Sequence, residues 1–143
     1  MDKDTLALLG DCTVGIDMTV STIDHVLPSV RDQVLRRRLQ DSIRSHTDLR
    51  EQSLILLQQW GGTEKRSSAM ARNVSKFKAG TRLALKRDDP TAAEVVADSC
   101  DLGIRTLCRS RNRYTGADHA AKFLTEQLIA CEENLSFSLR SFL

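Results

Sequence analysis

Apolar residues along this chain recur at alternating spacings of four and three, which is typical of helices that pack one face against other helices. The stretch Val34–Trp60 keeps this pattern longest. Its predicted packing face consists of Leu35, Leu39, Ser42/Ile43, His46, Leu49, Ser53, Leu56 and Trp60. His46 stands near the middle of that face. The pattern therefore predicts a long helix that carries one histidine into the core.

The same spacing predicts three further long helices. The first covers Asp4–Leu27 and ends before Pro28, because a residue that precedes proline avoids the α region. The third begins at Asp89-Pro90-Thr91 and ends before Gly116, and the fourth covers about Ala117–Phe142. The packing face predicted for the third helix consists of Val95/Val96, Ser99, Leu102/Gly103, Thr106 and Ser110. The face predicted for the fourth consists of Ala120/Ala121, Leu124, Gln127/Leu128, Cys131, Asn134/Leu135, Ser138 and Phe142.

Polar residues and glycines mark the expected ends of these helices. We expect Asp4 to cap the first helix and Ser29 the second, because side-chain oxygens there accept bonds from free backbone N–H groups. Thr91 with Glu94 fits a capping box at the start of the third helix. Gly61-Gly62 ends the second helix, because glycine readily adopts the left-handed turn of a helix exit.

Basic residues crowd the segment between the second and third helices. Its thin apolar stripe predicts an amphipathic helix over about residues 68–86, on the outside of the fold. Its basic residues are Lys65, Arg66, Arg72, Lys76, Lys78, Arg82, Lys86 and Arg87. With the single acid Glu64, residues 63–87 carry a charge of +7, so the rest of a chain of net charge +2 carries −5. We expect a solvated helix that complements an acidic bundle.

The lengths of the connections predict the topology. The first two helices are joined by a short turn, as are the last two, so each pair is antiparallel. The long middle connection can return along the whole length of the bundle. Together these features predict an all-α fold, a ferritin-like four-helix bundle with a short crossover helix between helices two and three, in one domain of residues 1–143. An up-down array with a fifth helix is the alternative.

Composition adds limits to this prediction. Of 143 residues, 41% are hydrophobic and 28% are charged, as in soluble globular proteins. From its first residues we expect no secretory signal, and we expect no membrane span, because no apolar run approaches the ~18 residues that span a bilayer. The cysteines form no Cys-x-x-Cys pair, so we expect reduced, buried thiols in a cytoplasmic protein. The four are Cys12, Cys100, Cys108 and Cys131.

Short motifs along the helices suggest a family. They are Leu8-Leu9-Gly10-Asp11 with Gly15, the Gly61-Gly62 exit, the basic crossover segment, and Asp101-Leu102-Gly103-Ile104. In these motifs and their order the chain resembles a group of bacterial ferritin-like bundle proteins that are distant relatives of rubrerythrin. The resemblance covers essentially the whole chain and implies the ferritin-like fold.

The metal ligands of that superfamily are incomplete here. Its carboxylate-bridged members hold two metal ions with a Glu from each of two helices and a Glu-x-x-His from each of two others. This chain has Ile43 three residues before His46, and Ile104 where a further acid would stand. The resemblance thus implies the fold and argues against di-iron chemistry. The remaining candidates for metal ligands are Asp17, His46 and Glu133.

The bundle core is expected to contain a small polar group. We expect a neutral His46 that is hydrogen-bonded in a polar core with Gln127 and Asn134, or to Asp17, because an unpaired buried polar group costs about 1–3 kcal/mol. The acids of the fourth helix are expected on its solvated face. They are Glu126, Glu132 and Glu133.

These features predict a non-enzymatic structural or interaction protein that has no cofactor, does not bind membranes and associates with itself or with a protein partner. Small residues on helix three permit close helix approach, within the bundle or against a second copy. One alternative is a metal-binding oxidoreductase or storage protein of the di-iron or di-manganese type. Another is nucleic-acid binding through residues 65–87, which Lys76→Glu with Arg82→Glu would abolish.

Overall fold

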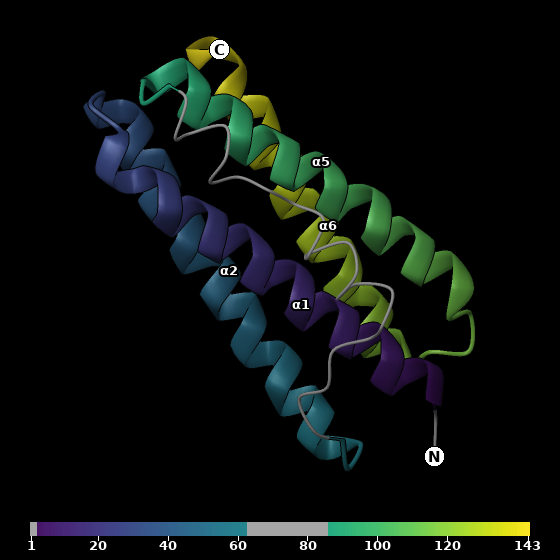
Figure 1. Ribbon diagram of the computed structural model, residues 1–143. Coiled ribbons are helices and arrows are strands. Elements are labelled where there is room, and N and C mark those ends of the chain that lie inside the picture. The colour runs from purple at the N-terminus through teal and green to yellow at the C-terminus, as the bar shows by residue number, and fades with distance from the viewer. Residues whose placement is uncertain (1–2, 63–85) are drawn as a thin grey trace.

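Four long helices make up the described part of the chain, as predicted. The computed structural model describes residues 3–62 and 86–143. Its helices are α1 (Lys3–Val26), α2 (Gln33–Gln59), α5 (Asp89–Arg113) and α6 (His119–Leu139), with short 3-10 turns at Leu27–Ser29 and Arg140–Phe142 (Figure 1). No residue in the two described ranges belongs to a strand. The all-α helical bundle is therefore confirmed.

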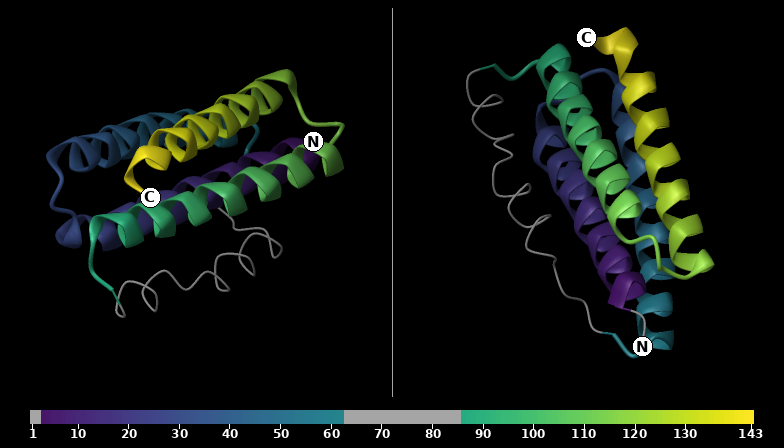
Figure 2. Two further views of the ribbon diagram at one scale, coloured as in Figure 1. Left: turned by 90° about the horizontal axis from the view of Figure 1, so that it is seen from above. Right: turned by 90° about the vertical axis from the view of Figure 1, so that its right-hand side faces the viewer.

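The helices form two antiparallel pairs. α1 and α2 are joined by a short turn, as are α5 and α6, and α1 and α6 each pack against both α2 and α5 (Figure 2). At one end the Asp89 carboxylate accepts from the backbone N–H groups of Arg31 and Asp32, so α5 begins beside the start of α2. At the other end Gly116 N–H donates to Asp4 at 2.9 Å. The end of α2 and the start of α5 therefore lie at opposite ends of the bundle, about 40 Å apart.

The predicted basic crossover helix falls mostly outside the described residues. Lys65, Arg72, Lys76, Lys78 and Arg82 all lie between positions 63 and 85. Lys86 lies within the described part of the chain, where it is exposed and its Nζ is 3.5 Å from Asp88 Oδ2.

Aspartates cap the last three of these helices. The side chains of Asp32, Asp88 and Asp118 accept from backbone N–H groups at the starts of α2, α5 and α6. The predicted caps Ser29 and Thr91 are wrong: Ser29 donates to Val26 O in the 3-10 turn, and Thr91 N–H is itself capped by Asp88. A carboxylate also complements the positive end of the helix dipole, which a hydroxyl does not.

Of the two other predicted helix ends, the Asp4 cap is wrong and the Gly61-Gly62 end of α2 is confirmed. Asp4 lies inside α1 rather than before it, and its carboxylate binds the loop between α5 and α6. Gly61 ends α2 as predicted, with φ +70°. Gly61 N–H donates to Gln58 O at 3.0 Å and Gly62 N–H to Leu57 O at 2.8 Å, the bond pattern of a Schellman turn.

The core has two apolar clusters. One contains Leu35, Leu39 and Leu139 near the start of α2, and the other contains Leu8, Leu57 and Leu124 near its end. On α2 the predicted positions from Leu35 to Ser53 are buried, but Leu56 and Trp60 are half-buried and Leu57 is buried instead. The predicted packing face of α5 is buried apart from the half-buried Leu102, and it includes the small residues. These small residues, Ser99, Gly103, Thr106 and Ser110, therefore serve packing within the bundle and do not face a second copy.

The packing face of α6 is only partly as predicted. The predicted Ala121, Leu124, Leu128 and Leu135 are buried, but Thr125, Glu132 and Leu139 are buried as well, each one residue after a predicted position. Gln127 and Asn134, predicted for the polar core, are exposed. The pattern misled because it placed the acid Glu132 in water, and so rotated the predicted face toward the half-buried Cys131.

α1 is the most apolar helix. By length and composition the segment Lys3–Ser29 could cross a membrane, which corrects the expectation that no segment is apolar enough. However, 72% of its most apolar window is buried inside the bundle, as is typical of a core helix. The apolar character of α1 is thus accounted for by its three helical neighbours.

Candidate functional site: a buried histidine–glutamate pair

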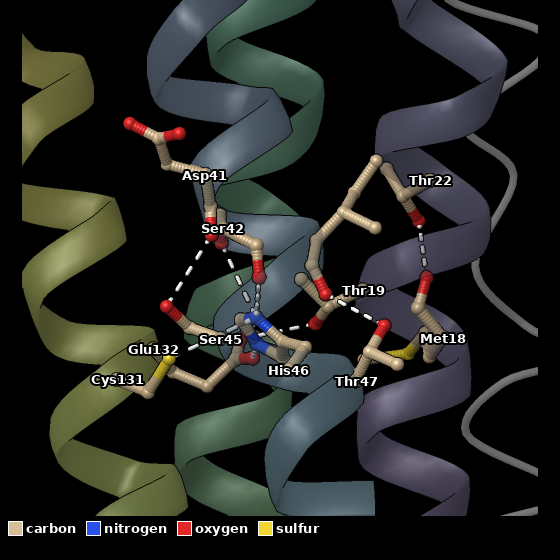
Figure 3. Close-up of polar contacts among 11 residues, drawn as sticks. Met18, Thr19, Thr22, Asp41, Ser42, Ser45, His46, Thr47, Cys131 and Glu132 are labelled. Atoms are coloured by element: carbon tan, nitrogen blue, oxygen red, sulfur yellow. Dashed lines mark hydrogen bonds and ion pairs between the residues drawn. The ribbon is translucent and has the colours of Figure 1, made fainter.

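A histidine and a glutamate meet between the two apolar clusters. His46 of α2 is 0% exposed and Glu132 of α6 is 1% exposed, and His46 Nε2 contacts Glu132 Oε1 (Figure 3). The burial of His46 is as predicted, but its partner is not Asp17, Gln127 or Asn134. The expectation that Glu132 lies on the solvated face is wrong, because the imidazole gives this carboxylate a partner inside the core.

Two further contacts hold the pair in place. His46 Nδ1 lies 2.8 Å from the Ser42 carbonyl oxygen, which can only accept, so Nδ1 carries a hydrogen. The Thr19 hydroxyl of α1 donates to Glu132 Oε2 at 3.1 Å. A side chain at Gly103 of α5 would place its Cβ 3.4 Å from the same oxygen. All four helices thus meet at this pair.

The contacts of His46 favour its protonated form. Burial by itself would lower the pKa of His46, but hydrogen bonds to Cys131 and Glu132 and the charge of Glu132 raise that pKa to about 10. This direction favours an imidazolium beside the Glu132 side chain, whereas the sequence predicts a neutral histidine. Burial and the same carboxylate raise the pKa of the Cys100 thiol, which stays neutral.

The candidate metal ligands are not brought together. Asp17 lies near the edge of the bundle, where it accepts from Arg50 Nε at 2.8 Å, and Glu133 is exposed. Within residues 3–62 and 86–143 no group of three or more His, Cys, Asp or Glu side chains could hold a metal ion. Of the three candidates only His46 lies in the core, and its Nε2 is occupied by Glu132.

A shallow groove of about 300 Å³ lies beside the pair, between α2 and α6. It is lined by Arg38, Asp41, Ser42, Ser45, Cys131, Asn134, Leu135 and Ser138. Cys131 connects the groove to the buried pair, because its Sγ lies 3.7 Å from His46 Nδ1 (Figure 3). Sequence reasoning missed Glu132, although a buried histidine needs a partner and Glu132 continues the seven-residue interval of Thr125 and Leu139.

Comparison of the chain with protein-family models, with curated proteins and with solved structures gives no match. The functional argument therefore rests on the contacts of the described residues.

Proposed function

We propose that the protein is a non-enzymatic structural bundle that associates with a second copy of itself through the outward face of α6. In this proposal the fold is ferritin-like and its metal site is degenerate, with the His46–Glu132 ion pair in its place. The observation that carries the self-association is a stripe of exposed apolar residues on α6, which we call the α6 stripe: Phe123, Ala130 and Phe137.

The α6 stripe has the spacing of a helix–helix contact. Phe123 is 65% exposed and Phe137 is 67% exposed, and the exposed Ala130 lies seven residues from each. Seven residues are about two helical turns, so the three side chains lie along one face. The small alanine between two rings lets a second helix approach closely. Two exposed phenylalanines on one face are typical of an interaction surface.

Polar residues beside the α6 stripe favour one orientation of the second copy. By helical geometry Glu126 and Glu133 lie along one side of the stripe, and Gln127 and Asn134 along the other. If the two α6 helices run parallel about a two-fold axis, the carboxylates of each copy face the amides of the other and accept hydrogen bonds from them. If they run antiparallel, Glu126 faces Glu133, and no amide donor meets either carboxylate. Arg111 Nη1 already pairs with Glu126 Oε1 at 2.5 Å within the chain, so charge repulsion contributes little to this choice. We therefore propose a parallel pair.

The loss of metal chemistry is supported by the ligands that are present. Between the two apolar clusters the described core contains one imidazole, that of His46, and one carboxylate, that of Glu132. Each is the hydrogen-bond partner of the other. A borderline or hard divalent ion needs several converging ligands. The two antiparallel helix pairs, with α2 and α5 starting at the same end, match the ferritin-like arrangement of helices.

Sedimentation velocity over a range of protein concentrations tests the self-association. We expect a dimer for the unmodified protein and a monomer for Phe123→Glu/Phe137→Glu, because four carboxylates would then meet at the contact. The matched control is Val34→Glu/Ile55→Glu, which changes two exposed apolar residues of α2 and should leave the dimer intact. A protein that stays monomeric throughout, or a control that also dissociates, would refute the proposed face.

Metal analysis of the purified protein, before and after loading with iron and manganese, tests the degenerate site. We expect no metal in stoichiometric amount. One or two ions per chain that are lost in His46→Gln would instead support the metal-binding alternative.

A further inference from the structure

The outward face of α5 carries a row of charged side chains in which the two signs are separated. We call it the α5 charged row, and it has about one residue in each helical turn: Glu94, Asp98, Asp101, Arg105, Arg109 and Arg113. The first three are acids and the last three are arginines, and all except the half-buried Asp98 are exposed. Negative charge therefore fills one half of the row and positive charge the other, over a length of about 28 Å.

The helix dipole accounts for only part of this separation. It stabilises acids at the start and bases at the end of a helix, but the effect falls off within the first and last turns. Asp101 and Arg105 lie near the middle of the 25-residue α5. The change of sign between these two residues is therefore not a consequence of the dipole.

The centre of the row is not neutralised within the described chain. Arg105 and Arg109 form no ion pair with any residue in the ranges 3–62 and 86–143. Asp101 accepts a hydrogen bond from the neutral Ser136 hydroxyl at 3.2 Å, which leaves the charge of this carboxylate in place. These charges are therefore available to charges from another molecule.

The α5 charged row is complementary to itself when its direction is reversed. If a second copy of α5 lies antiparallel across a two-fold axis next to Gly103, each acid of one copy stands opposite an arginine of the other, to within about one residue or ~1.5 Å along the helix. The pairs are Glu94 with Arg113, Asp98 with Arg109, and Asp101 with Arg105. In a parallel arrangement acids would face acids and arginines would face arginines. The charges therefore select the antiparallel orientation.

We propose that the α5 charged row is a second contact between copies of this chain, in which two α5 helices pair antiparallel through ion pairs. The contact is independent of the α6 stripe, which lies on a different helix. Ion pairs between exposed side chains contribute little each and are weakened by salt, so the contact is weak and salt-dependent. A chain that uses both contacts has one two-fold axis along the bundle and one across it, and two such axes that intersect build a tetramer.

Sedimentation velocity of the full-length protein at about 20 mM and about 500 mM NaCl tests the contact, because added salt screens exposed charges. The variant Phe123→Glu/Phe137→Glu is measured beside the unmodified protein. At low salt we expect this variant to pass from monomer to dimer and the unmodified protein from dimer to tetramer, and at high salt both steps should reverse. A variant that stays monomeric at both salt concentrations would overturn the proposal. Identical behaviour of the two proteins, each forming a dimer at low salt only, would refute the α6 stripe alone.

A charge swap at the centre of the row identifies the pairing. Asp101→Arg alone and Arg105→Asp alone should each weaken the low-salt association about tenfold, because like charges then meet. The combined Asp101→Arg/Arg105→Asp should restore it, because both members of each central pair are reversed together. The swap is made at these positions because Glu94 and Asp98 also have partners within the chain. Arg37→Asp changes an exposed arginine of α2 and is the matched control, which should leave the association unchanged.

Three results of the charge swap would contradict the proposal. Failure of the combined variant to regain association, with circular dichroism unchanged, would show that Asp101 and Arg105 do not face each other. Association that is lost in Arg105→Asp but kept in Asp101→Arg would show that the arginines meet an acidic surface other than α5. An equal loss in Arg37→Asp would assign the effect to the net charge of the chain.

Discussion

The two faces of α6 are both unusual: the inner face contains a buried charge, and the outer face contains exposed aromatic rings. The inner face buries the carboxylate of Glu132 to 1% exposure, while the outer face leaves Phe123 and Phe137 about two-thirds exposed. The difference lies in the partners. The buried charge is matched within the chain by His46 and Thr19. The rings remain largely exposed, and the Arg140 guanidinium lies over the Phe137 ring, 5.1 Å from its centroid. The inner exception concerns the stability of this fold, and the outer one is the basis of the proposed self-association.

The buried pair on the inner face of α6 also bears on how the helices are arranged. A buried ion pair adds little net stability, because removing two charges from water offsets most of their attraction. Removing one partner is costly, since the other charge then stays buried alone. We infer that the pair fixes which faces of α2 and α6 meet, because a different register of either helix would bury a charge without its partner.

The largest effect is expected from removing the buried carboxylate. Glu132→Ala should lower the free energy of unfolding by about 3–5 kcal/mol, because protonated His46 loses its partner. The adjacent Glu133→Ala is the matched control and should change it by less than about 0.5 kcal/mol, because Glu133 is exposed. Urea unfolding measures both. Equal losses of unfolding free energy in the two variants would contradict the contrast between a buried Glu132 and an exposed Glu133.

The second largest loss of stability is expected from a buried leucine of α6, and the exposed phenylalanine beside it in the sequence is the control. Leu124 is 2% exposed and Phe123 is 65% exposed. Leu124→Ala should lower the free energy of unfolding by about 2–5 kcal/mol, because it leaves a cavity in the core. Phe123→Ala should change it by about 0.5 kcal/mol or less when measured below the concentration at which dimers form. A large loss from Phe123→Ala under these conditions would show that this ring already packs within one chain.

A smaller effect should appear in the dependence of stability on pH. Folding raises the pKa of His46 from 6.5 to about 10, so the folded state holds this proton more tightly than the unfolded state. The resulting stabilisation is complete below pH 6.5 and is lost as the pH rises through 10. The free energy of unfolding should therefore fall between pH 6.5 and 9. His46→Gln/Glu132→Gln should flatten the profile, and a steep fall in that variant would assign the effect to other groups.

The smallest effect is expected when both charges are replaced together. His46→Leu/Glu132→Met should lie within about 1 kcal/mol of the unmodified protein or exceed its stability, because apolar residues of similar size need no desolvation of charge. Together with Glu132→Ala this variant separates the cost of an unpaired charge from the value of the pair. A loss as large as that of Glu132→Ala would show that the ion pair itself stabilises the fold.

The reliability of the sequence pattern differed between α2 and α6 for an identifiable reason. On α2 the seam from Leu35 to Ser53 is occupied by apolar and small residues, and His46 is its one ionisable member. On α6 the corresponding seam contains Glu132, and a carboxylate is usually found in water. Assigning it there put the half-buried Cys131 on the predicted face in its place. It also placed Gln127 and Asn134 in the core.

The helical pattern of the chain was enough to predict the order of the four described helices and the burial of His46, because helical periodicity and chain breakers act over a few residues. It could not predict which acid meets this histidine. His46 and Glu132 are 86 residues apart, so their contact depends on α2 and α6 being neighbours and on the register in which they pack. Burial then makes the pairing obligatory, because neither charge has access to water at that depth.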